Sequence, residues 1–317
     1  MPLVLLAWTL VTALAMPAAG EMLEESIPAG PEGTVEIELD FGEGLRPDPG
    51  FLAVDTHASD EVRLQVETSG WGTWGVYSSI SGASDKVTVR VMVSGNTTWM
   101  FGGPNVRVHV WVPESAGVDA RCRGGALRIS DIGGPVRARV RDADVEIRGV
   151  EGPVRLRVVG GAVDVEEVTG AVEVASTDGG IRAARIGGGV EARTSDGDIE
   201  LQHVTGGVTA KTLAGDIELS DVEGPAVART EEGSVEARFS KGAAGSLETE
   251  RGSVLVVVPN GAGATVDARA TRGQVELSPG LAWNGEADAE HAAGTIGPGG
   301  PRLSLRTSRG EIRVSGQ

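Results

Sequence analysis

The sequence has very little sulfur and few aromatic rings. Its 317 residues include one cysteine, four histidines and only 3% aromatic residues. One cysteine cannot form an intramolecular disulfide, and so few cysteines and histidines leave little material for a zinc site. The core must therefore be built from Val, Ile, Leu and Ala, which the hydrophobic share of 40% can supply.

Positive charge and helical periodicity are also scarce. Lys and Arg number 28 against 45 Asp and Glu, so the net charge is −17, which argues against a nucleic-acid partner. No segment repeats its apolar residues with the 3.6 period of a helix. Glycine is abundant instead, with 48 residues beside 15 prolines, a share below that of low-complexity disorder.

The first 20 residues, MPLVLLAWTLVTALAMPAAG, contain no charged side chain. The apolar run from Leu3 to Met16 has the length of a signal-peptide core and is shorter than the ~20 residues of a spanning helix. Ala18 and Gly20 are the small residues that allow cleavage before Glu21. We therefore predict a signal peptide over residues 1–20, no membrane span after cleavage, and a periplasmic, extracellular or cell-surface location.

Glycines recur every 18 residues in two series that lie nine residues out of phase. The first series is Gly134, Gly152, Gly170, Gly188, Gly206 and Gly224, and the second is Gly161, Gly179, Gly197, Gly215 and Gly233. Between the glycines, apolar and polar residues alternate, as in Val136, Ala138 and Val140. This pattern predicts strand–turn–strand–turn units, with glycines supplying positive φ at the corners.

One such unit cannot bury its own apolar face, but stacked units can. The sequence therefore predicts an all-β fold: a parallel β-solenoid of 18-residue rungs with an N-terminal antiparallel β cap. Residues 34–115 form the cap region and residues 116–317 the solenoid, with regular rungs over 116–242 and irregular rungs with insertions over 243–317. Handedness and cross-section stay open. Residues 279–301 are expected to be a surface loop, and residues 303–307 to close the stack.

The repeats carry a T-x-x-G-x-[IV]-x-[LA] core. It occurs as TSDGDIEL at Thr194–Leu201, TLAGDIEL at Thr212–Leu219 and TEEGSVEA at Thr230–Ala237. These runs resemble the bacterial "putative adhesin" family, a domain of unknown function designated DUF4097, over roughly residues 35–315. The resemblance implies a β-solenoid that is exported or envelope-associated and that has no established catalytic residues.

Residue patterns typical of catalysis or metal binding are hard to find. Asp178, Asp196, Asp198 and Asp216 lie near successive turns, but turn chemistry explains them without Ca²⁺, so no metal or cofactor is predicted. Carboxylates follow the repeat, and no pair stands out for glycoside hydrolysis. We therefore predict no catalytic residues; Glu290 and His291, in the segment 279–301, are the exceptions to the regular pattern.

Two features suggest a binding surface. Trp71, Trp74 and Tyr77 are candidate ligand contacts, because aromatic faces on a loop can stack on sugar rings or partner side chains; alternatively they plug the end of the core. Arginines alternate with core residues and are expected to face solvent, paired with acidic residues on neighbouring rungs. These arginines are Arg137, Arg139, Arg141, Arg155, Arg157 and Arg193. The alternative is that they form a face for an anionic polymer.

The predicted function is that of an exported, non-catalytic envelope or surface interaction protein, with adhesion as one form. It would present a repetitive surface to an envelope polymer or a surface protein, with no nucleic-acid partner; the oligomeric state stays open. The alternatives are a carbohydrate-active enzyme, meaning a polysaccharide lyase or hydrolase on a parallel β-helix, and a structural envelope scaffold.

Overall fold

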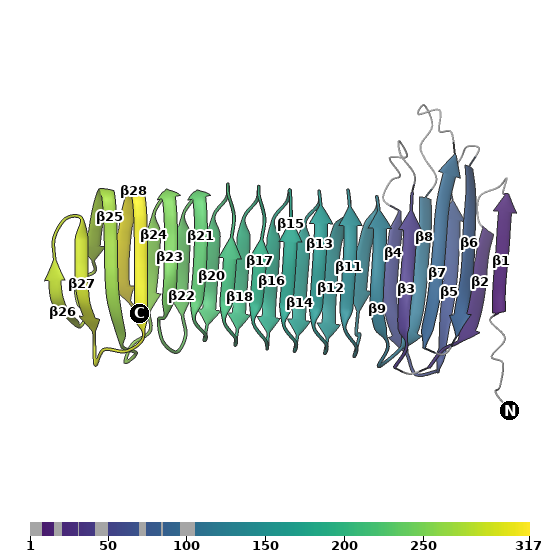
Figure 1. The fold of residues 1–317 in the computed structure, drawn as a ribbon, viewed down its shortest axis with the longest axis horizontal. Helices are drawn as coiled ribbons and strands as arrows, with labels where there is room; N and C mark the ends of the chain where they lie inside the picture. The colour runs from purple at the N-terminus through teal and green to yellow at the C-terminus, as the bar shows by residue number, and fades with distance from the viewer. Residues whose placement is uncertain are drawn as a thin grey trace. The chain divides into compact units, whose positions relative to one another are not determined.

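The computed structural model describes residues 8–15, 21–30, 32–41, 50–69, 74–83, 85–95 and 105–317. All regular elements in this part of the chain are strands, and it contains no helix of the length and hydropathy needed to cross a membrane. The chain divides into two compact units, Met1–Ala162 and Val163–Gln317. Each unit is described by itself, with the strand labels of Figure 1.

Unit 1 contains strands β1 to β13. Their bounds are β1 Trp8–Ala15, β2 Glu21–Pro28, β3 Thr34–Asp40, β4 Phe51–His57, β5 Glu61–Ser69, β6 Trp74–Ala83, β7 Lys86–Gly95, β8 Asn105–Pro113, β9 Gly117–Arg123, β10 Ala126–Ser130, β11 Val136–Arg141, β12 Asp144–Val150 and β13 Val154–Val159.

The strands of unit 1 form two parallel ladders. One ladder runs β7–β3–β9–β11–β13, and the other runs β8–β4–β10–β12. In both, every second side chain is buried, as Val136, Ala138 and Val140 are on β11. Each 18-residue rung thus contributes one strand to each ladder, so the cross-section that the sequence leaves open has two sheets.

The antiparallel cap expected at the N-terminus is present. β6 pairs with β7, β5 with β8, β2 with β5, and β1 with β6, all antiparallel. β3 and β4 differ from the rest of this region, because they pair parallel on both sides and form a rung between β7/β8 and β9/β10. β1 lies within the predicted signal peptide, and its backbone pairing with β6 leaves that prediction untested.

Unit 2 contains strands β14 to β28. Their bounds are β14 Val163–Val168, β15 Val172–Ser176, β16 Ile181–Ile186, β17 Val190–Arg193, β18 Ile199–Val204, β19 Val208–Lys211, β20 Ile217–Val222, β21 Ala226–Glu232, β22 Val235–Phe239, β23 Gly245–Arg251, β24 Val254–Val258, β25 Ala264–Leu277, β26 Trp283–Ala287, β27 His291–Ile296 and β28 Arg302–Gly316.

Unit 2, taken by itself, is also built from two parallel ladders. One ladder runs β15–β17–β19–β21–β23, and the other runs β14–β16–β18–β20–β22–β24. The long strand β28 joins both ladders, because its first half pairs with β23 and its second half with β24. The parallel β-solenoid predicted from the repeat is therefore confirmed.

The C-terminal end of unit 2 corrects two predictions. Residues 279–301 are not simply a surface loop, because they contain β26 and β27, an antiparallel hairpin in which β27 pairs with β25. β28 does not close the stack either, since it lies between the β23/β24 rung and β25. The apolar alternation in 279–301 is too short and too rich in glycine to reveal these strands.

The glycine series have two different physical causes. In the second series φ is positive, with 114° at Gly161 and 136° at Gly197, as expected for glycine corners. The first series lacks positive φ, so that explanation is wrong there. A Cβ added at Gly152 would lie 2.4 Å from the carbonyl oxygen of Gly134, and one at Gly224 would lie 2.4 Å from that of Gly206. Close approach between rungs excludes a side chain at these turns.

Buried threonines add a second link between rungs. The Thr212 hydroxyl donates to the carbonyl oxygen of Gly197 at 3.1 Å, and Thr230 donates to Gly215 at 3.0 Å. Thr249 and Thr307 repeat the bond to the glycine of the preceding rung. Each hydroxyl is therefore satisfied inside the core, which explains why threonine occupies an inward position of the T-x-x-G motif.

We predict that Gly215→Ala strongly destabilises unit 2. Gly215 has a φ of 140°, and a Cβ there would lie 2.2 Å from the carbonyl oxygen of Gly197. The methyl group would force neighbouring rungs apart, so the free energy of unfolding should fall by about 2–4 kcal/mol in urea titrations. Gly242→Ala is the control, because no atom lies within 4 Å of a Cβ there; its effect should stay below about 0.5 kcal/mol. Equal effects of the two substitutions would contradict the close-approach explanation.

Candidate functional site

A surface with an excess of basic side chains lies on the outer side of unit 1. Strands β9, β11 and β13 direct seven arginines to solvent, and we call this set the arginine face. Its members are Arg121, Arg123, Arg137, Arg139, Arg141, Arg155 and Arg157. Asp119 and Val159 hold the two remaining outward positions of these strands. Three adjacent strands thus carry six net positive charges in a chain whose net charge is −17.

The register of the ladder places arginine next to arginine. Arg137 is opposite Arg155 and Arg139 is opposite Arg157 on β13. Arg139 and Arg141 are opposite Arg121 and Arg123 on β9. Neighbouring parallel strands lie about 4.8 Å apart, and like charges directly opposite each other destabilise a sheet. Stability of the fold therefore does not explain this arrangement.

The predicted ion pairs are confirmed for only some of these arginines. Arg139 and Arg121 contact Asp119, at 3.5 and 4.0 Å. Among the described residues, Arg137, Arg141 and Arg157 form no ion pair, so the prediction is wrong for them. For Arg141 and Arg157 the register gives a reason, because it places Arg123 and Arg139 opposite them. Arg137 lies opposite Asp119 on β9, but the carboxylate of Asp119 contacts Arg139 and Arg121 instead.

The opposite ladder of unit 1 shows the compensated arrangement. On β10 and β12, Arg128 and Arg148 both contact Glu146, at 2.7 and 2.9 Å. The guanidinium of Arg128 also lies over the Phe51 ring, 5.1 Å from its centroid. The ladder of β10 and β12 therefore pairs these arginines with a carboxylate, whereas the ladder of β9, β11 and β13 has arginines in excess.

The arginine face is hollowed. A depression of about 410 Å³ is lined by five of its arginines, all except Arg137 and Arg155, together with Glu38 and Asp40 of β3. Cys122 also borders it, but burial raises the pKa of this thiol to about 12, and nearby Asp40 adds to the rise. Cys122 therefore stays protonated at neutral pH and is not a nucleophile.

Tyr77 lies on the same side of the sheet as the arginine face. It is 48% exposed on β6 and is opposite Met92 of β7, which is 53% exposed. Met92 is in turn opposite Asp40, which is opposite Arg123. Of the other predicted contacts, Trp71 lies outside the described residues, and for Trp74 only the backbone, at the start of β6, is described.

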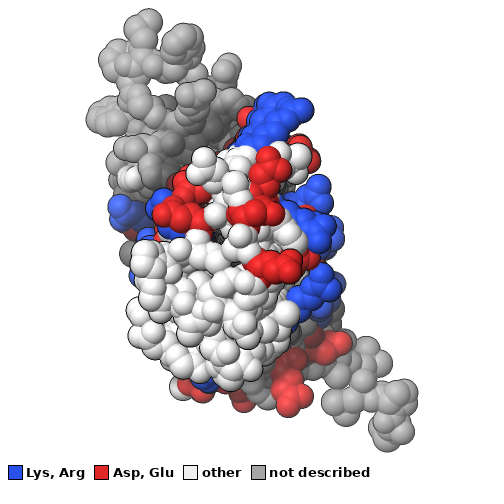
Figure 2. All heavy atoms as spheres, turned by 90° about the vertical axis from the view of Figure 1, so that its left-hand side faces the viewer, with Lys and Arg blue, Asp and Glu red and all other residues white. Residues whose placement is uncertain are grey.

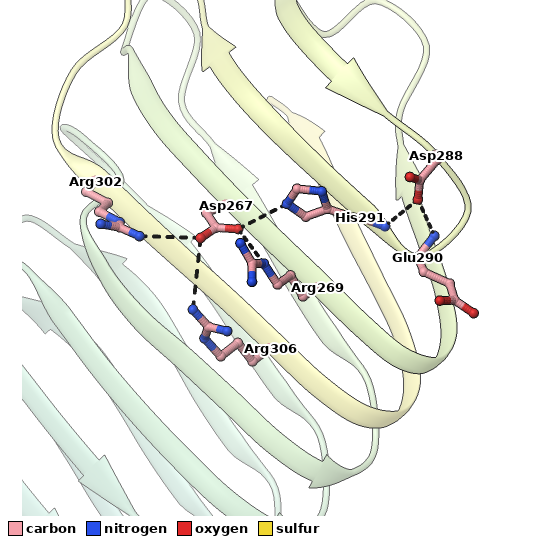
Figure 3. A network of polar contacts seen from close by, with 7 residues as sticks. All are labelled: Asp267, Arg269, Asp288, Glu290, His291, Arg302 and Arg306. Carbon is pink, nitrogen blue, oxygen red and sulfur yellow. Dashed lines mark hydrogen bonds and ion pairs between the residues drawn. The ribbon is translucent and has the colours of Figure 1, made fainter.

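A second cluster of charges lies at the C-terminal end of unit 2, around Asp267 (Figure 3). One carboxylate oxygen of Asp267 lies 3.1 Å from Arg269 Nε and 3.3 Å from His291 Nε2. The other oxygen lies 3.3 Å from an Arg302 nitrogen and 3.9 Å from one of Arg306. The cluster joins β25, β27 and β28. His291, which departs from the regular repeat pattern in the sequence, therefore belongs to a network of contacts between the strands at this end.

The surroundings of Asp267 and Asp288 lower the pKa of both carboxyl groups and so favour their charged form. Burial alone would raise the pKa of Asp267, but hydrogen bonds from His291 and Arg269 and the attraction of Arg269 and Arg306 outweigh it, so the pKa is lowered from 3.8. Asp288 accepts the N–H groups of Glu290 and His291, both at 2.8 Å, and these bonds lower its pKa as well. A glycosidase acid needs a raised pKa, so neither group is suited to that role.

Figure 2 looks onto this end of unit 2. Acidic and basic side chains lie close together over one part of the surface, and the rest of the end face is uncharged. The ion pairs of Asp267 with Arg269, Arg302 and His291 belong to this end of unit 2. This end therefore carries a paired network, in contrast to the arginine excess of unit 1.

The histidines outside this cluster lack a catalytic setting. His57 Nδ1 lies 2.7 Å from Ser59 Oγ in a local turn, but its Nε2 is buried without a hydrogen-bond partner, so no carboxylate orients the ring. His109 contacts Asp55 and stacks on Trp111 on a strand surface. His203, exposed as expected, contacts Asp221 of the next rung at 3.1 Å.

The aspartates at the turns serve the backbone. Asp198 accepts the N–H of Asp216 at 2.8 Å, and Asp216 accepts the N–H of Ser234 at 2.7 Å. Asp144 repeats this contact with Ala162. These carboxylates cap the next rung, and no group of three His, Cys, Asp or Glu in the described part of the chain is arranged to hold a metal ion.

Two ladders, glycine turns and a threonine column define a β-solenoid protein with a charged outer face. Residues 205–315 match the sequence model of a family described as Toastrack DUF4097. The resemblance seen in the T-x-x-G repeats is therefore supported over residues 205–315, which contain the runs Thr212–Leu219 and Thr230–Ala237. None of the curated proteins matches the chain.

Three solved structures resemble the chain along most of its length. A "putative cell adhesion protein" from Clostridium sporogenes has 10% identity and a TM-score of 0.23, and the match covers 94% of this chain and 100% of that one. A "putative adhesin" from Bacteroides fragilis has 14% identity and a TM-score of 0.27 over 93% and 97% of the two chains. A "putative adhesin" from Parabacteroides distasonis has 11% identity and a TM-score of 0.28, and the match covers 94% of this chain and 98% of that one. Similarity at this level says nothing about what this chain binds.

We predict that Asp267→Asn weakens the C-terminal end of unit 2. Four cationic or donor side chains would lose their shared carboxylate, so the free energy of unfolding at pH 7 should fall by about 1–3 kcal/mol. Because the folded-state pKa of Asp267 is lowered, its contribution is present above the unfolded pKa of 3.8 and disappears as pH falls through the folded value. The difference between the two proteins should therefore shrink below about pH 4 in urea titrations.

Glu290→Gln is the matched control for Asp267→Asn. The Glu290 side chain is exposed and forms no ion pair among the described residues, so its neutralisation should leave stability unchanged at every pH. If both substitutions shift the unfolding curve equally, or if the Asp267 effect does not shrink as pH falls below about 4, the network does not stabilise this end.

Proposed function

We propose that the chain is an exported, non-catalytic interaction module of the cell envelope or surface. Its partner is an envelope polymer or a surface protein, and adhesion is one form that the interaction takes. The protein is held outside the cytoplasm after removal of residues 1–20. The outer faces of its ladders are the binding surfaces.

The arginine excess on β9, β11 and β13 carries this proposal. Six exposed arginines and the half-buried Arg123 stand at fixed register on a sheet, although opposite charges would stabilise it better. Asp119 offsets part of this repulsion, and a partner with negative charge would offset the charge of Arg141 and Arg157, which form no ion pair among the described residues. A stiff ladder also holds these groups in place without a partner, which lowers the entropy lost on binding.

An enzyme is the weaker alternative for two reasons. Two groupings of titratable residues, around Asp267 and on the arginine face, offer lowered carboxyl pKa values or permanently charged guanidinium groups. The depression on the arginine face contains Glu38 and Asp40, for which no donor–acceptor pair typical of acid–base catalysis is present among the described residues. Permanently charged guanidinium groups and ionised carboxylates are suited to binding charged partners.

The proposal predicts saturable binding to one envelope fraction. The full chain is mixed with isolated cell-wall polymer, outer-membrane and exopolysaccharide fractions, and bound protein is measured by co-sedimentation across a salt series. Binding should be strongest at low salt, because exposed charges are screened within about 10 Å at 0.1 M salt. Absence of binding to every fraction at low salt would overturn the proposal.

Export has its own test. When the full coding sequence is expressed in a bacterial host, we expect the protein outside the cytoplasm with Glu21 as its first residue, as measured by fractionation and intact mass. Replacing Ala18 with Arg should block cleavage, since the processing site needs small residues. A cytoplasmic protein of full mass from the unaltered sequence would contradict export.

A further inference from the structure

The row through Tyr77 joins aromatic, basic and apolar groups across six strands of unit 1. In register order it contains Tyr77, Met92, Asp40, Arg123, Arg141 and Val159, on β6, β7, β3, β9, β11 and β13. At about 4.8 Å per strand, the row is roughly 24 Å long. Tyr77, Met92 and Val159 are exposed large hydrophobic residues, so apolar groups stand at both ends of the row.

The neighbouring row supplies most of the positive charge. It contains Arg90, Glu38, Arg121, Arg139 and Arg157 in register order. Arg90 contacts Glu38 at 3.0 Å, so Glu38 is already neutralised within the row. The depression of about 410 Å³ lies over both rows, and Arg141 and Arg157, which line it, form no ion pair among the described residues.

We propose that these two rows bind an acidic polysaccharide, a polymer of sugars carrying carboxylate or sulfate groups, laid across the strands. This inference rests on the proposed function and names its ligand class. Arginine binds carboxylate and sulfate through paired N–H donors, and a row of arginines at strand spacing suits a polymer whose anionic groups recur at intervals. The exposed Tyr77 ring offers a flat apolar face against which a sugar ring can stack.

The other polyanions fit this surface less well. Single-stranded nucleic acid is bound through several aromatic rings that stack on successive bases, whereas Tyr77 is the one aromatic residue in the row. An anionic membrane would require apolar side chains that insert together, but Tyr77 and Val159 are separated by charged groups along the row. A sugar polymer needs neither feature.

The test uses the full chain and defined polymers. Polygalacturonate supplies carboxylates on sugars, dextran sulfate supplies sulfates on sugars, neutral dextran supplies sugars without charge, and inorganic polyphosphate supplies charge without sugars. Affinities are measured by titration calorimetry from about 20 mM to about 200 mM NaCl, a range over which screening of exposed charges rises steeply. We expect binding to at least one acidic polysaccharide and none to neutral dextran.

Two double variants separate the arginine face from charge in general. Arg141→Gln with Arg157→Gln removes two exposed arginines of the rows, and Arg272→Gln with Arg309→Gln removes two exposed arginines of unit 2 that also form no ion pair among the described residues. The first pair should weaken binding about tenfold or more at low salt and lower the salt dependence by about two charges. The second pair should change affinity less than about twofold.

Tyr77→Ala separates sugar recognition from polyanion binding. It should weaken binding of the acidic polysaccharide and leave binding of polyphosphate unchanged. Surface substitutions of this kind change stability by no more than about 0.5 kcal/mol, and unfolding curves of all variants verify that they fold.

Several results would overturn the inference. These are equal losses from the two double variants, equal affinity for polyphosphate and polysaccharide with no effect of Tyr77→Ala, or binding to vesicles of phosphatidylglycerol in place of polysaccharide. If the Arg141/Arg157 variant still binds an envelope fraction as the unaltered chain does, the inference fails while the proposed function stands.

Discussion

The close approach of successive turns is the constraint on which the rest of the structure depends. At these corners the backbone of one rung lies so near the next that a Cβ would fall within about 2–2.6 Å of a carbonyl oxygen. Strands 4.8 Å apart cannot stay paired if their connecting turns are pushed further apart. The turn glycines thereby allow successive rungs to keep the spacing that the ladder hydrogen bonds require. The threonine column reinforces the same contact from inside, because each hydroxyl donates to a turn glycine carbonyl of the preceding rung.

This regularity is the part of the fold that the sequence predicts well. An exact 18-residue repeat of Gly134 to Gly224 leaves few alternatives to a stack of rungs, because each apolar position must meet its equivalent one repeat later. The prediction is weaker where the repeat stops. The placement of β3/β4 between β7/β8 and β9/β10, and of β28 between β24 and β25, depends on pairings over long sequence distances. A local pattern of apolar residues carries no information about which of several edges a strand will join.

The sequence predicts the arginine face only in part, for a related reason. Alternation shows that Arg137 and Arg139 face outward, and Tyr77 stands out as an aromatic residue in a chain with few. The 18-residue repeat places Arg139 opposite Arg157, but it does not show which carboxylates the side chains reach diagonally, as Arg139 reaches Asp119. Glu146 shows the compensated outcome on one ladder, and Arg157 the uncompensated outcome on the other. The Asp267 network is harder still, because it joins three strands whose order the repeat does not reveal.

The position of β28 has a consequence for how the chain assembles. β25, β26 and β27 are synthesised before β28, yet β28 is the strand through which they pair with β23 and β24. Rungs of the regular region can join the stack one after another as they leave a ribosome or a translocation channel. The β25–β27 segment must instead wait with an open edge until Arg302–Gly316 arrives. The last event at this end is thus the insertion of a strand between two others, and the order of assembly differs from the order of emergence.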